Sequence, residues 1–301
     1  MMNFRVSLLF AAALCATVPL ATPVAASTPA LAQGAVDSLI AADRAFADAA
    51  KDKELVDGLL PMFDAETVMP APTGFVTGTE AIAAALKANP ANAGAKASWA
   101  PVRGGVSADG SHGFTIGFMT ITAEGKPTRN AKYVAYWIKR PAGWRVAVYK
   151  RAGRPDGDVS LDLMPPSLPE RKLKPTKDAK TLAGYKASLD KAERDFSDLS
   201  RKIGLGPAFV QNGRADATNI GAGPGFTVGN EKIGADVAKF NGPPIQWGPE
   251  DVLVSSTGDF GITWGFIRPV TPPANGQPGG GPYTTIWRRA APDQPWRYVA
   301  E

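Results

Sequence analysis

Cysteine and histidine are almost absent from the sequence. Its 301 residues contain one cysteine, Cys15, and one histidine, His112. Cys15 lies in a segment interpreted below as a leader, so the remaining chain can form no disulfide, thiol nucleophile or cysteine-ligated metal site. One histidine cannot supply a histidine-rich metal site, nor a Ser-His-Asp triad in each half of the chain. We therefore expect no metal site and no cofactor.

Long basic blocks are lacking as well. The net charge of +5 comes from 33 basic and 28 acidic residues, and no Lys/Arg block has the length of a nucleic-acid-binding tail. The densest basic stretch, residues 171–174, is flanked by acidic residues, so we interpret it as solvated linker rather than as a contact to an anionic surface. We expect no nucleic-acid partner. The chain length predicts two domains, and the 44% hydrophobic share is enough for a core.

The first 32 residues follow the pattern of a secretory signal peptide. Arg5 precedes an apolar stretch at residues 6–20, and small-residue cleavage candidates follow at residues 24–26 and 30–32. The apolar stretch is too short to cross a bilayer as a helix, and no later segment approaches about 18 apolar residues. Leu14 is larger than the small residue that lipoprotein cleavage expects before a cysteine. We expect a signal peptide at residues 1–32 and an exported protein, periplasmic or secreted, without a membrane span.

The most informative feature is an internal duplication with an offset near 150 residues. The matched segments keep their order: residues 42–46 with 192–196, 74–82 with 225–233, 113–118 with 261–266, and 144–145 with 296–297. Because this offset changes by only a few residues along the chain, it indicates two copies of one domain rather than a short solenoid repeat. We predict domains at residues 33–152 and 183–301. A Pro-rich linker at residues 153–182 is expected to be an extended tether.

Each copy is predicted to place helices before strands. A first helix has Asp37 or Ser38 as its N-cap, and a later helix is capped by Thr79 in copy one and Asn230 in copy two. The short second helix of copy one, residues 56–63, should have a shorter counterpart in copy two, where glycines interrupt it. Four strands are expected in copy one, at residues 97–107, 112–123, 130–140 and 143–151. The predicted class is α+β.

Several motifs carry a resemblance to a known family. They are the opening Ala42-Asp43-Arg44-Ala45-Phe46, a Phe-x-x-Gly-x-x-x-Ile segment from Phe75, and a closing hairpin with Tyr133, Trp137 and Gly143-Trp144-Arg145. Their order, seen twice, resembles the nuclear transport factor 2-like superfamily, in its ketosteroid-isomerase-like and SnoaL-like branch, as two tandem copies. The resemblance implies two cone-shaped α+β domains, each with helices packed in a strongly curved antiparallel sheet around an apolar cavity. Members include isomerases, dehydratases, cyclases and non-catalytic binding or assembly domains, so the fold does not settle the function.

The resemblance offers a test for catalysis. A ketosteroid isomerase needs a carboxylate base on the segment before the glycine turn. That segment is residues 67–72 here and residues 218–223 in copy two, and neither contains Asp or Glu. Asp64, Glu66 and Asp216 come earlier and are expected to face solvent.

A dehydratase-like or cyclase-like site would instead use a histidine. His112 is the one candidate catalytic residue, and its place directly after the turn at residues 109–111 favours an exposed side chain. Copy two has Phe260 at the equivalent position. A histidine-based site could therefore exist in the first domain only.

Candidate ligand-binding residues fall into two groups. Arg44 and Arg194 recur on the first helix, beside acids expected on the helix surface. Each is either a structural arginine bonded to carbonyls at a sheet end, or a clamp for an anionic ligand at the cavity mouth. Aromatic residues either pack in the core or line a pocket for a flat apolar ligand. The aromatic candidates are Trp99, Tyr136, Trp247 and Trp264.

The absent acid–base pair makes a non-catalytic small-ligand-binding or scaffold module the leading hypothesis. The alternative is a cofactor-free isomerase, dehydratase or cyclase that acts on a small lipophilic substrate in the first-domain cavity. A purely structural interaction domain is the third hypothesis, favoured if aromatic side chains fill the cavities. We also expect the two copies to pair sheet to sheet as an intramolecular pseudo-dimer.

Overall fold

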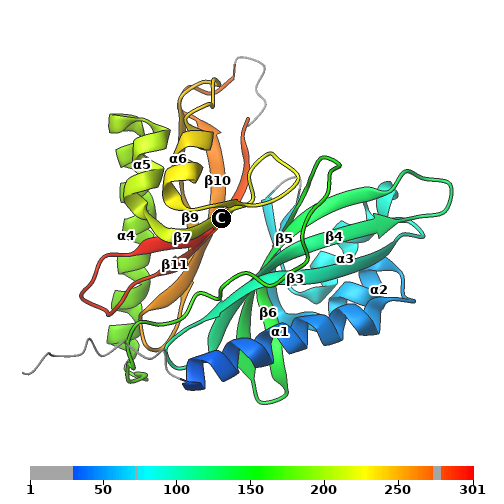
Figure 1. Ribbon diagram of the computed structural model, residues 1–301, viewed down its shortest axis with the longest axis horizontal. Helices are drawn as coiled ribbons and strands as arrows, with labels where there is room; N and C mark the ends of the chain where they lie inside the picture. The colour runs from blue at the N-terminus through cyan, green and yellow to red at the C-terminus, as the bar shows by residue number, and fades with distance from the viewer. Residues whose placement is uncertain (1–29, 72–73, 274–278) are drawn as a thin grey trace, which may run out of the picture.

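A computed structural model describes residues 30–71, 74–273 and 279–301 (Figure 1). The expected leader, apart from its last three residues, lies outside the described residues. The chain forms a first unit, residues 30–153, and a second unit, residues 179–301, each with helices and one six-stranded sheet. Within the described ranges, no helix combines the length and the apolar character that crossing a bilayer demands.

The first unit contains three α-helices, two 3-10 turns and six strands among its described residues. In chain order they are α1 (Ala30–Ala50), α2 (Leu55–Leu59), η1 (Leu60–Met62), β1 (Phe63–Ala71), β2 (Gly74–Thr77), α3 (Thr79–Lys87), η2 (Pro90–Asn92), β3 (Lys96–Val106), β4 (His112–Thr122), β5 (Arg129–Arg140) and β6 (Gly143–Gly153). The sheet order is β2-β1-β6-β5-β4-β3. All neighbouring strands are antiparallel except β1 and β6, which are parallel.

The second unit repeats this arrangement. Its elements are α4 (Ala179–Ile203), α5 (Leu205–Asn212), β7 (Gly213–Asn219), β8 (Thr227–Val228), α6 (Asn230–Val237), β9 (Ile245–Val254), β10 (Phe260–Pro269), β11 (Gly281–Arg288) and β12 (Arg297–Ala300). The sheet order, β8-β7-β12-β11-β10-β9, matches the first. Neither curved sheet closes into a barrel, and two tandem α+β cones are the architecture of the chain.

The strands predicted for copy one agree closely with β3 to β6. The first two strands of each sheet, β1 with β2 and β7 with β8, were not predicted. These strands lack the alternation of apolar residues that marks a half-buried strand: β1 carries Pro70, and β7 is largely polar and small. Their pairing is nevertheless equivalent, since Val68 lies opposite Val148 in one sheet and Thr218 opposite Ala300 in the other.

The predicted helix caps are wrong. Helix α1 begins at Ala30, so Asp37 and Ser38 lie inside it. Thr79 and Asn230 are the first residues of their helices, and the N-cap residues are Gly78 and Gly229. These two glycines have φ values of 90° and 96°, which side chains rarely tolerate. The chain therefore enters both helices by a left-handed residue rather than by a side-chain cap.

The second helix of copy two is also longer than predicted. Helix α5 has eight residues, against five in α2. Gly206 does not interrupt it, because this glycine is where α5 approaches α6. A Cβ at Gly206 would lie 2.9 Å from the carbonyl oxygen of Gly234 and 2.9 Å from the Cβ of Ala238.

Each sheet has one face toward its own helices and one toward the other sheet. In the first unit Leu39 of α1 and Trp137 of β5 belong to one buried core. A second buried cluster combines outer-face residues of both sheets: Phe114, Ile116, Val134, Tyr136 and Val148 with Phe260, Ile262, Trp264, Ile286 and Ala300. The rings of Tyr136 and Phe260 are stacked with centroids 5.7 Å apart. The two sheets therefore pack against each other on the faces that the helices leave free.

The connecting segment, residues 154–178, is extended but attached. The amide of Met164 donates to the Val102 carbonyl (2.7 Å), and the amide of Ser167 donates to the Gly104 carbonyl (2.9 Å). An ideal Cβ at Gly105 would lie 2.6 Å from the Ser167 carbonyl oxygen, so only glycine admits this approach. The segment thus runs along the edge strand β3, and α4 begins at Ala179, inside the expected linker.

Candidate functional site

Each unit holds a buried acid on the inner face of its first helix. Asp43 of α1 has 0% exposure and accepts hydrogen bonds from Trp99 Nε1 and from the Tyr133 hydroxyl, both at 2.8 Å. Burial raises the pKa of Asp43, and the donors offset part of this effect. The predicted surface position is wrong. The signal lay in the spacing, since Asp43 is four residues from both Leu39 and Ala47 on the buried helix face.

Glu193 occupies the equivalent place in the second unit. It is fully buried and accepts from Trp247 Nε1 (2.6 Å), from Trp287 Nε1 (3.0 Å) and from the Thr263 hydroxyl. Burial raises the pKa of Glu193 to about 7. Its predicted surface position is wrong for the same reason.

The two units differ at the tyrosine next to this acid. The Tyr133 hydroxyl donates a hydrogen bond to Asp43. Tyr283 lies at the equivalent position, but the longer Glu193 is already bonded to two tryptophans and a threonine. The Tyr283 hydroxyl is buried and has no hydrogen-bond partner among the residues that the structure describes. A buried hydroxyl without a partner costs free energy.

The interior of the first unit is filled by its own side chains. Phe63, Met69 and Tyr149 belong to its packed core, with the rings of Phe63 and Tyr149 5.4 Å apart. The short helix η2 follows α3, and there the Asn92 amide donates to the Leu86 carbonyl (2.8 Å). Arg129 fastens η2 by donating to the Ala91 carbonyl (2.7 Å).

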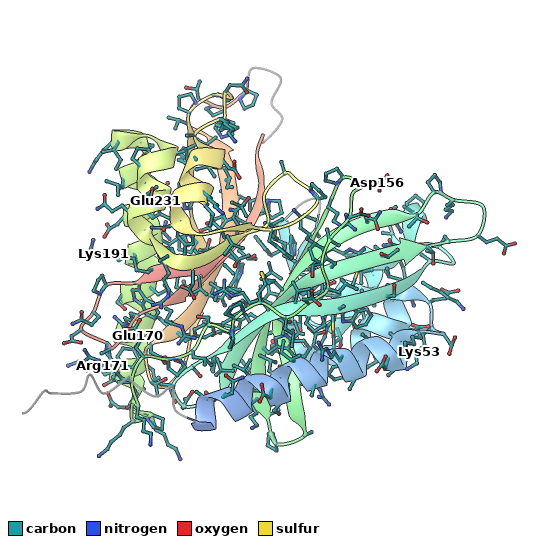
Figure 2. The ribbon with its side chains drawn as sticks, in the orientation of Figure 1. Lys53, Asp156, Glu170, Arg171, Lys191 and Glu231 are labelled. Atoms are coloured by element: carbon teal, nitrogen blue, oxygen red, sulfur yellow. The ribbon has the colours of Figure 1, made fainter. Side chains whose placement is uncertain are left out.

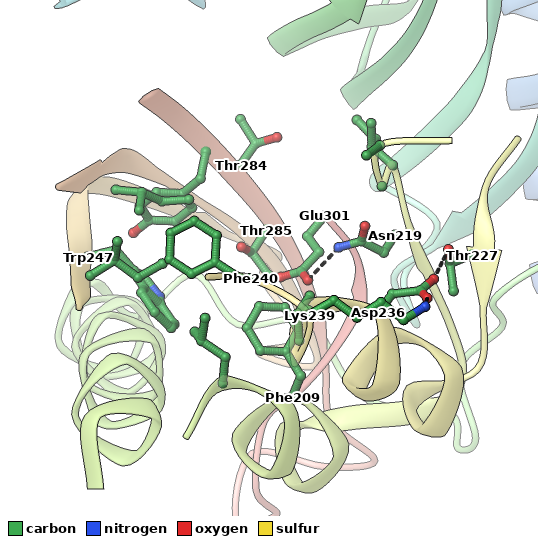
Figure 3. A pocket seen from close by; sticks show the side chains of 18 of the residues that line it. Phe209, Asn219, Thr227, Asp236, Lys239, Phe240, Trp247, Thr284, Thr285 and Glu301 are labelled. Carbon is green, nitrogen blue, oxygen red and sulfur yellow. Dashed lines mark hydrogen bonds and ion pairs between the residues drawn. The ribbon is translucent and has the colours of Figure 1, made fainter. Parts of the chain in front are cut away.

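The interior of the second unit contains a cavity of about 830 Å³ (Figure 3). The strand pairing places Asn219 where the first unit has Met69, and Glu301 where it has Tyr149. Residues 238–244, which follow α6, form no helix comparable to η2. The apolar walls consist of Phe196, Leu205, Phe209, Ile220, Ala222, Val237, Phe240, Ile245, Trp247 and Ile267. Smaller or more polar residues at these two positions thus accompany the cavity of the second unit.

Polar groups meet at the inner end of this cavity. The Asn219 amide donates to Glu301 Oε1 at 2.8 Å, as Figure 3 shows. Burial raises the pKa of Glu301 to about 8. Lys150 of β6 reaches the same cavity from the first unit, and burial lowers its pKa to about 8. Among the described residues, the Lys150 ammonium forms no hydrogen bond or ion pair within 4 Å. At the rim, Asp236 accepts from Lys239 Nζ (2.8 Å) and Thr227 Oγ1 (3.0 Å).

The first unit also holds the loop that borders the cavity. Lys132 of β5 donates to the carbonyls of Gly223 (2.6 Å) and Gly225 (2.8 Å), and also to those of Ile220 and Gly221. This loop joins β7 to β8, and part of it lines the cavity. The cavity is therefore a site to which both units contribute.

The raised pKa of Glu301 predicts a pH dependence of stability. An acid with a folded-state pKa near 8 stabilises the fold below its unfolded pKa of 4.5, and this contribution is lost as the pH rises toward 8. Glu193 acts in the same direction, and Lys150 titrates mainly above this window. His112 acts in the opposite direction below about pH 6.5, because its pKa is lowered to about 4 in the folded state, but two raised acids outweigh one lowered histidine. We expect the free energy of unfolding to fall from pH 5 to pH 7.5, and to fall less steeply in Glu301→Gln. Denaturant titrations across this range measure both slopes, and identical slopes would refute the assignment to Glu301.

The predicted site residues do not form one site. Trp99 and Trp247 contact the buried acids, and Trp247 also lines the cavity. Tyr136 and Trp264 lie between the two sheets. His112 lies on that same face of β4, two residues before Phe114, with its Nδ1 2.9 Å from the Tyr136 hydroxyl.

The remaining predictions concern charged residues. His112 is half-buried rather than exposed, and burial lowers its pKa to about 4. Arg194 matches the structural alternative, because it pairs with Asp190 (2.8 Å) and donates to the Pro249 carbonyl (3.0 Å). Arg44 is exposed and borders a groove between α1 and residues 163–166. Asp64 is buried and paired with Arg140 (2.8 Å), so its predicted solvent exposure is wrong.

The side chains near the cavity give no metal-binding set. No group of three or more His, Cys, Asp or Glu residues with a geometry for a metal ion occurs among residues 30–71, 74–273 and 279–301. The chemistry that the cavity offers is that of an ammonium, a carboxyl, an amide and a phenol in an apolar surround.

Comparison with known proteins finds structural neighbours only. No protein-family model matches the sequence, and no curated protein matches it. A protein of unknown function with a cystatin-like fold from Nostoc punctiforme is 15% identical, with a TM-score of 0.33, over 40% of this chain and 92% of that chain. An NTF2-like protein of unknown function from Shewanella oneidensis is 12% identical, with a TM-score of 0.32, over 38% and 96%.

A ketosteroid isomerase-like protein from Erwinia carotovora is 13% identical, with a TM-score of 0.32, over 39% of this chain and 95% of that chain. Each match spans nearly the whole of the other protein and about two fifths of this one. Over that share of its length the chain is similar to NTF2-like, cystatin-like and ketosteroid isomerase-like structures.

Proposed function

We propose that this is a ligand-binding protein whose second unit takes up a small, mostly apolar molecule, while the first unit is its packed, supporting half. The observation that carries the proposal is the contrast between the two interiors. Side chains fill the first interior, whereas the second has a cavity of about 830 Å³ with Tyr283 among its lining residues. This volume lies within the roughly 300–1,000 Å³ typical of small-molecule sites.

We further propose that the domains at residues 33–152 and 183–301 form an intramolecular pseudo-dimer, joined by residues 153–182. Near-symmetric contacts between the units support this. Asp109 accepts from the Ser256 hydroxyl (2.6 Å), and Asp259 accepts from the amide of Ala108, the residue equivalent to Ser256 (3.1 Å). The shared outer-face cluster supplies the apolar contact that such a pairing needs.

Export to the periplasm or the medium is part of the proposal. It is supported by the leader pattern of residues 1–32 and by the lack of cysteine after Cys15. A catalytic role in the first unit has little support, because Phe63, Met69 and Tyr149 occupy that interior. His112 lies on the opposite face of the sheet from that interior. The first unit instead fits the structural hypothesis.

A neutral fluorescent probe, N-phenyl-1-naphthylamine, tests the ligand-binding proposal. We expect one saturable site per chain, and a rise in melting temperature that grows with probe concentration, because the probe binds the folded state. Fluorescence titration and thermal unfolding of the full chain measure the two effects. Absence of saturable binding up to the solubility limit of the probe would contradict the proposal.

A further inference from the structure

We propose that the ligand of the second-unit cavity is a small organic acid, with an apolar body in the cavity and a carboxylate bound by Lys150 of the first unit. The inference rests on the proposed function and adds the ligand class and the anchoring residue. The ligand would then contact both units at once, since its body lies against the second unit and its head against the first.

The placement of Lys150 is the first argument. On β6, Val148 belongs to the cluster between the two sheets, and Lys150 lies two residues further on the same face. Its side chain leaves that cluster and lines the cavity together with Thr284 and Thr285 of β11. Among the described residues, no acceptor lies within hydrogen-bond distance of its ammonium. Lys150 is half-buried, and an ammonium partly withdrawn from water without a counter-ion is costly, so the site favours an incoming anion.

The acids near the cavity leave this cation unpaired. Glu301 is not in an ion pair with Lys150, and it accepts its hydrogen bond from Asn219. Its raised pKa keeps Glu301 largely protonated at neutral pH, so that it can donate to a ligand oxygen. Glu193 is occupied by three donors, and Asp236 is paired with Lys239. Burial thus favours the protonated carboxyl of Glu301, and the ammonium of Lys150 has no ion-pair partner within 4 Å among the described residues.

The number of donors selects the head group. One ammonium and one carboxylic acid can hold the two oxygens of a carboxylate, and Asn219 positions the acid. A phosphate carries about two charges at neutral pH, and the described lining provides neither an arginine nor a second unpaired cation for it. The largely apolar wall fits an aromatic or alicyclic body with at most one further polar group.

Two probes with the same body separate this inference from the proposed function. They are 1-naphthaleneacetate, which carries a carboxylate, and 2-(1-naphthyl)ethanol, which carries a hydroxyl. Calorimetric titration of the full chain at pH 7 is expected to show at least tenfold tighter binding of the acid. Equal affinities would overturn the inference and leave the proposed function intact. Binding of neither probe would overturn both.

Variants of Lys150 identify the anchor. In Lys150→Met the acid should lose its tenfold advantage while the alcohol binds as before, and Lys150→Arg should retain a preference for the acid. Lys150→Met removes a charge that burial disfavours, so its melting temperature should not fall below that of the parent chain. Lys53→Met is the control, because Lys53 is exposed at the outer edge of the first unit (Figure 2). A preference that survives Lys150→Met would overturn the assignment.

Discussion

Replacing Arg288 by methionine should lower the free energy of unfolding by about 3–5 kcal/mol. Arg288 has 0% exposure and joins three parts of the chain. Its Nη2 donates to the Val106 carbonyl (2.7 Å) in the first unit, and its Nε donates to the Ser167 hydroxyl (3.0 Å) in the connecting segment. Its Nη1 lies 3.5 Å from Asp259 in its own unit. Methionine would leave these buried acceptors without their donor and Asp259 without its cation.

Arg268→Met is the matched control for this experiment. The Arg268 side chain is 54% exposed and lies 3.7 Å from Glu250, so its loss should change stability by less than about 1 kcal/mol. Denaturant titration of both variants measures the difference. Equal stabilities of the two variants would show that the buried contacts between the units contribute little, and would argue against the proposed pseudo-dimer.

The second large effect is expected when the residues of the first interior are placed in the second. The double variant Asn219→Met with Glu301→Tyr introduces the residues found at the equivalent positions Met69 and Tyr149. Met69 and Tyr149 help to fill the first interior, so the same side chains should fill part of the second-unit cavity. The variant should therefore bind N-phenyl-1-naphthylamine about 100-fold more weakly or worse, which corresponds to a loss of about 2.8 kcal/mol in binding free energy. Stability should be retained or increased, because apolar side chains replace a buried polar pair.

The control for the double variant makes the same kind of change on the surface. Gln211 and Glu231 are exposed, Glu231 on helix α6 (Figure 2), so Gln211→Met with Glu231→Tyr should leave probe binding unchanged. Fluorescence titration compares the two double variants. Retained binding in the Asn219→Met and Glu301→Tyr variant would place the probe elsewhere and contradict the cavity as the site.

The sequence predicts the architecture better than the site. The duplication is visible because glycines, tryptophans and turn residues recur at a nearly constant offset. The strands β3 to β6 are long and apolar enough to be found. The strands β1 and β7 are not, because pairing with the last strand of each sheet rather than local apolar content stabilises them.

The site depends on contacts between distant residues. Asp43 meets Trp99 across 56 positions of the sequence, so its burial could be inferred only from the helix face that it shares with Leu39. Alternation along a strand puts Tyr136 and Trp137 on opposite faces, but it does not say which face is concave. The cavity itself arises from single replacements such as Asn219 for Met69, which no local pattern reveals.

A crystal structure of the full chain with 1-naphthaleneacetate tests the central claim most directly. The account predicts the naphthyl ring in the second-unit cavity beside Trp247 and Phe209, with its carboxylate within hydrogen-bond distance of Lys150 Nζ and the Glu301 carboxyl. The interior of the first unit should remain filled by Phe63, Met69 and Tyr149. A ligand bound in the first interior, or a second-unit cavity filled by the protein's own side chains, would contradict the account.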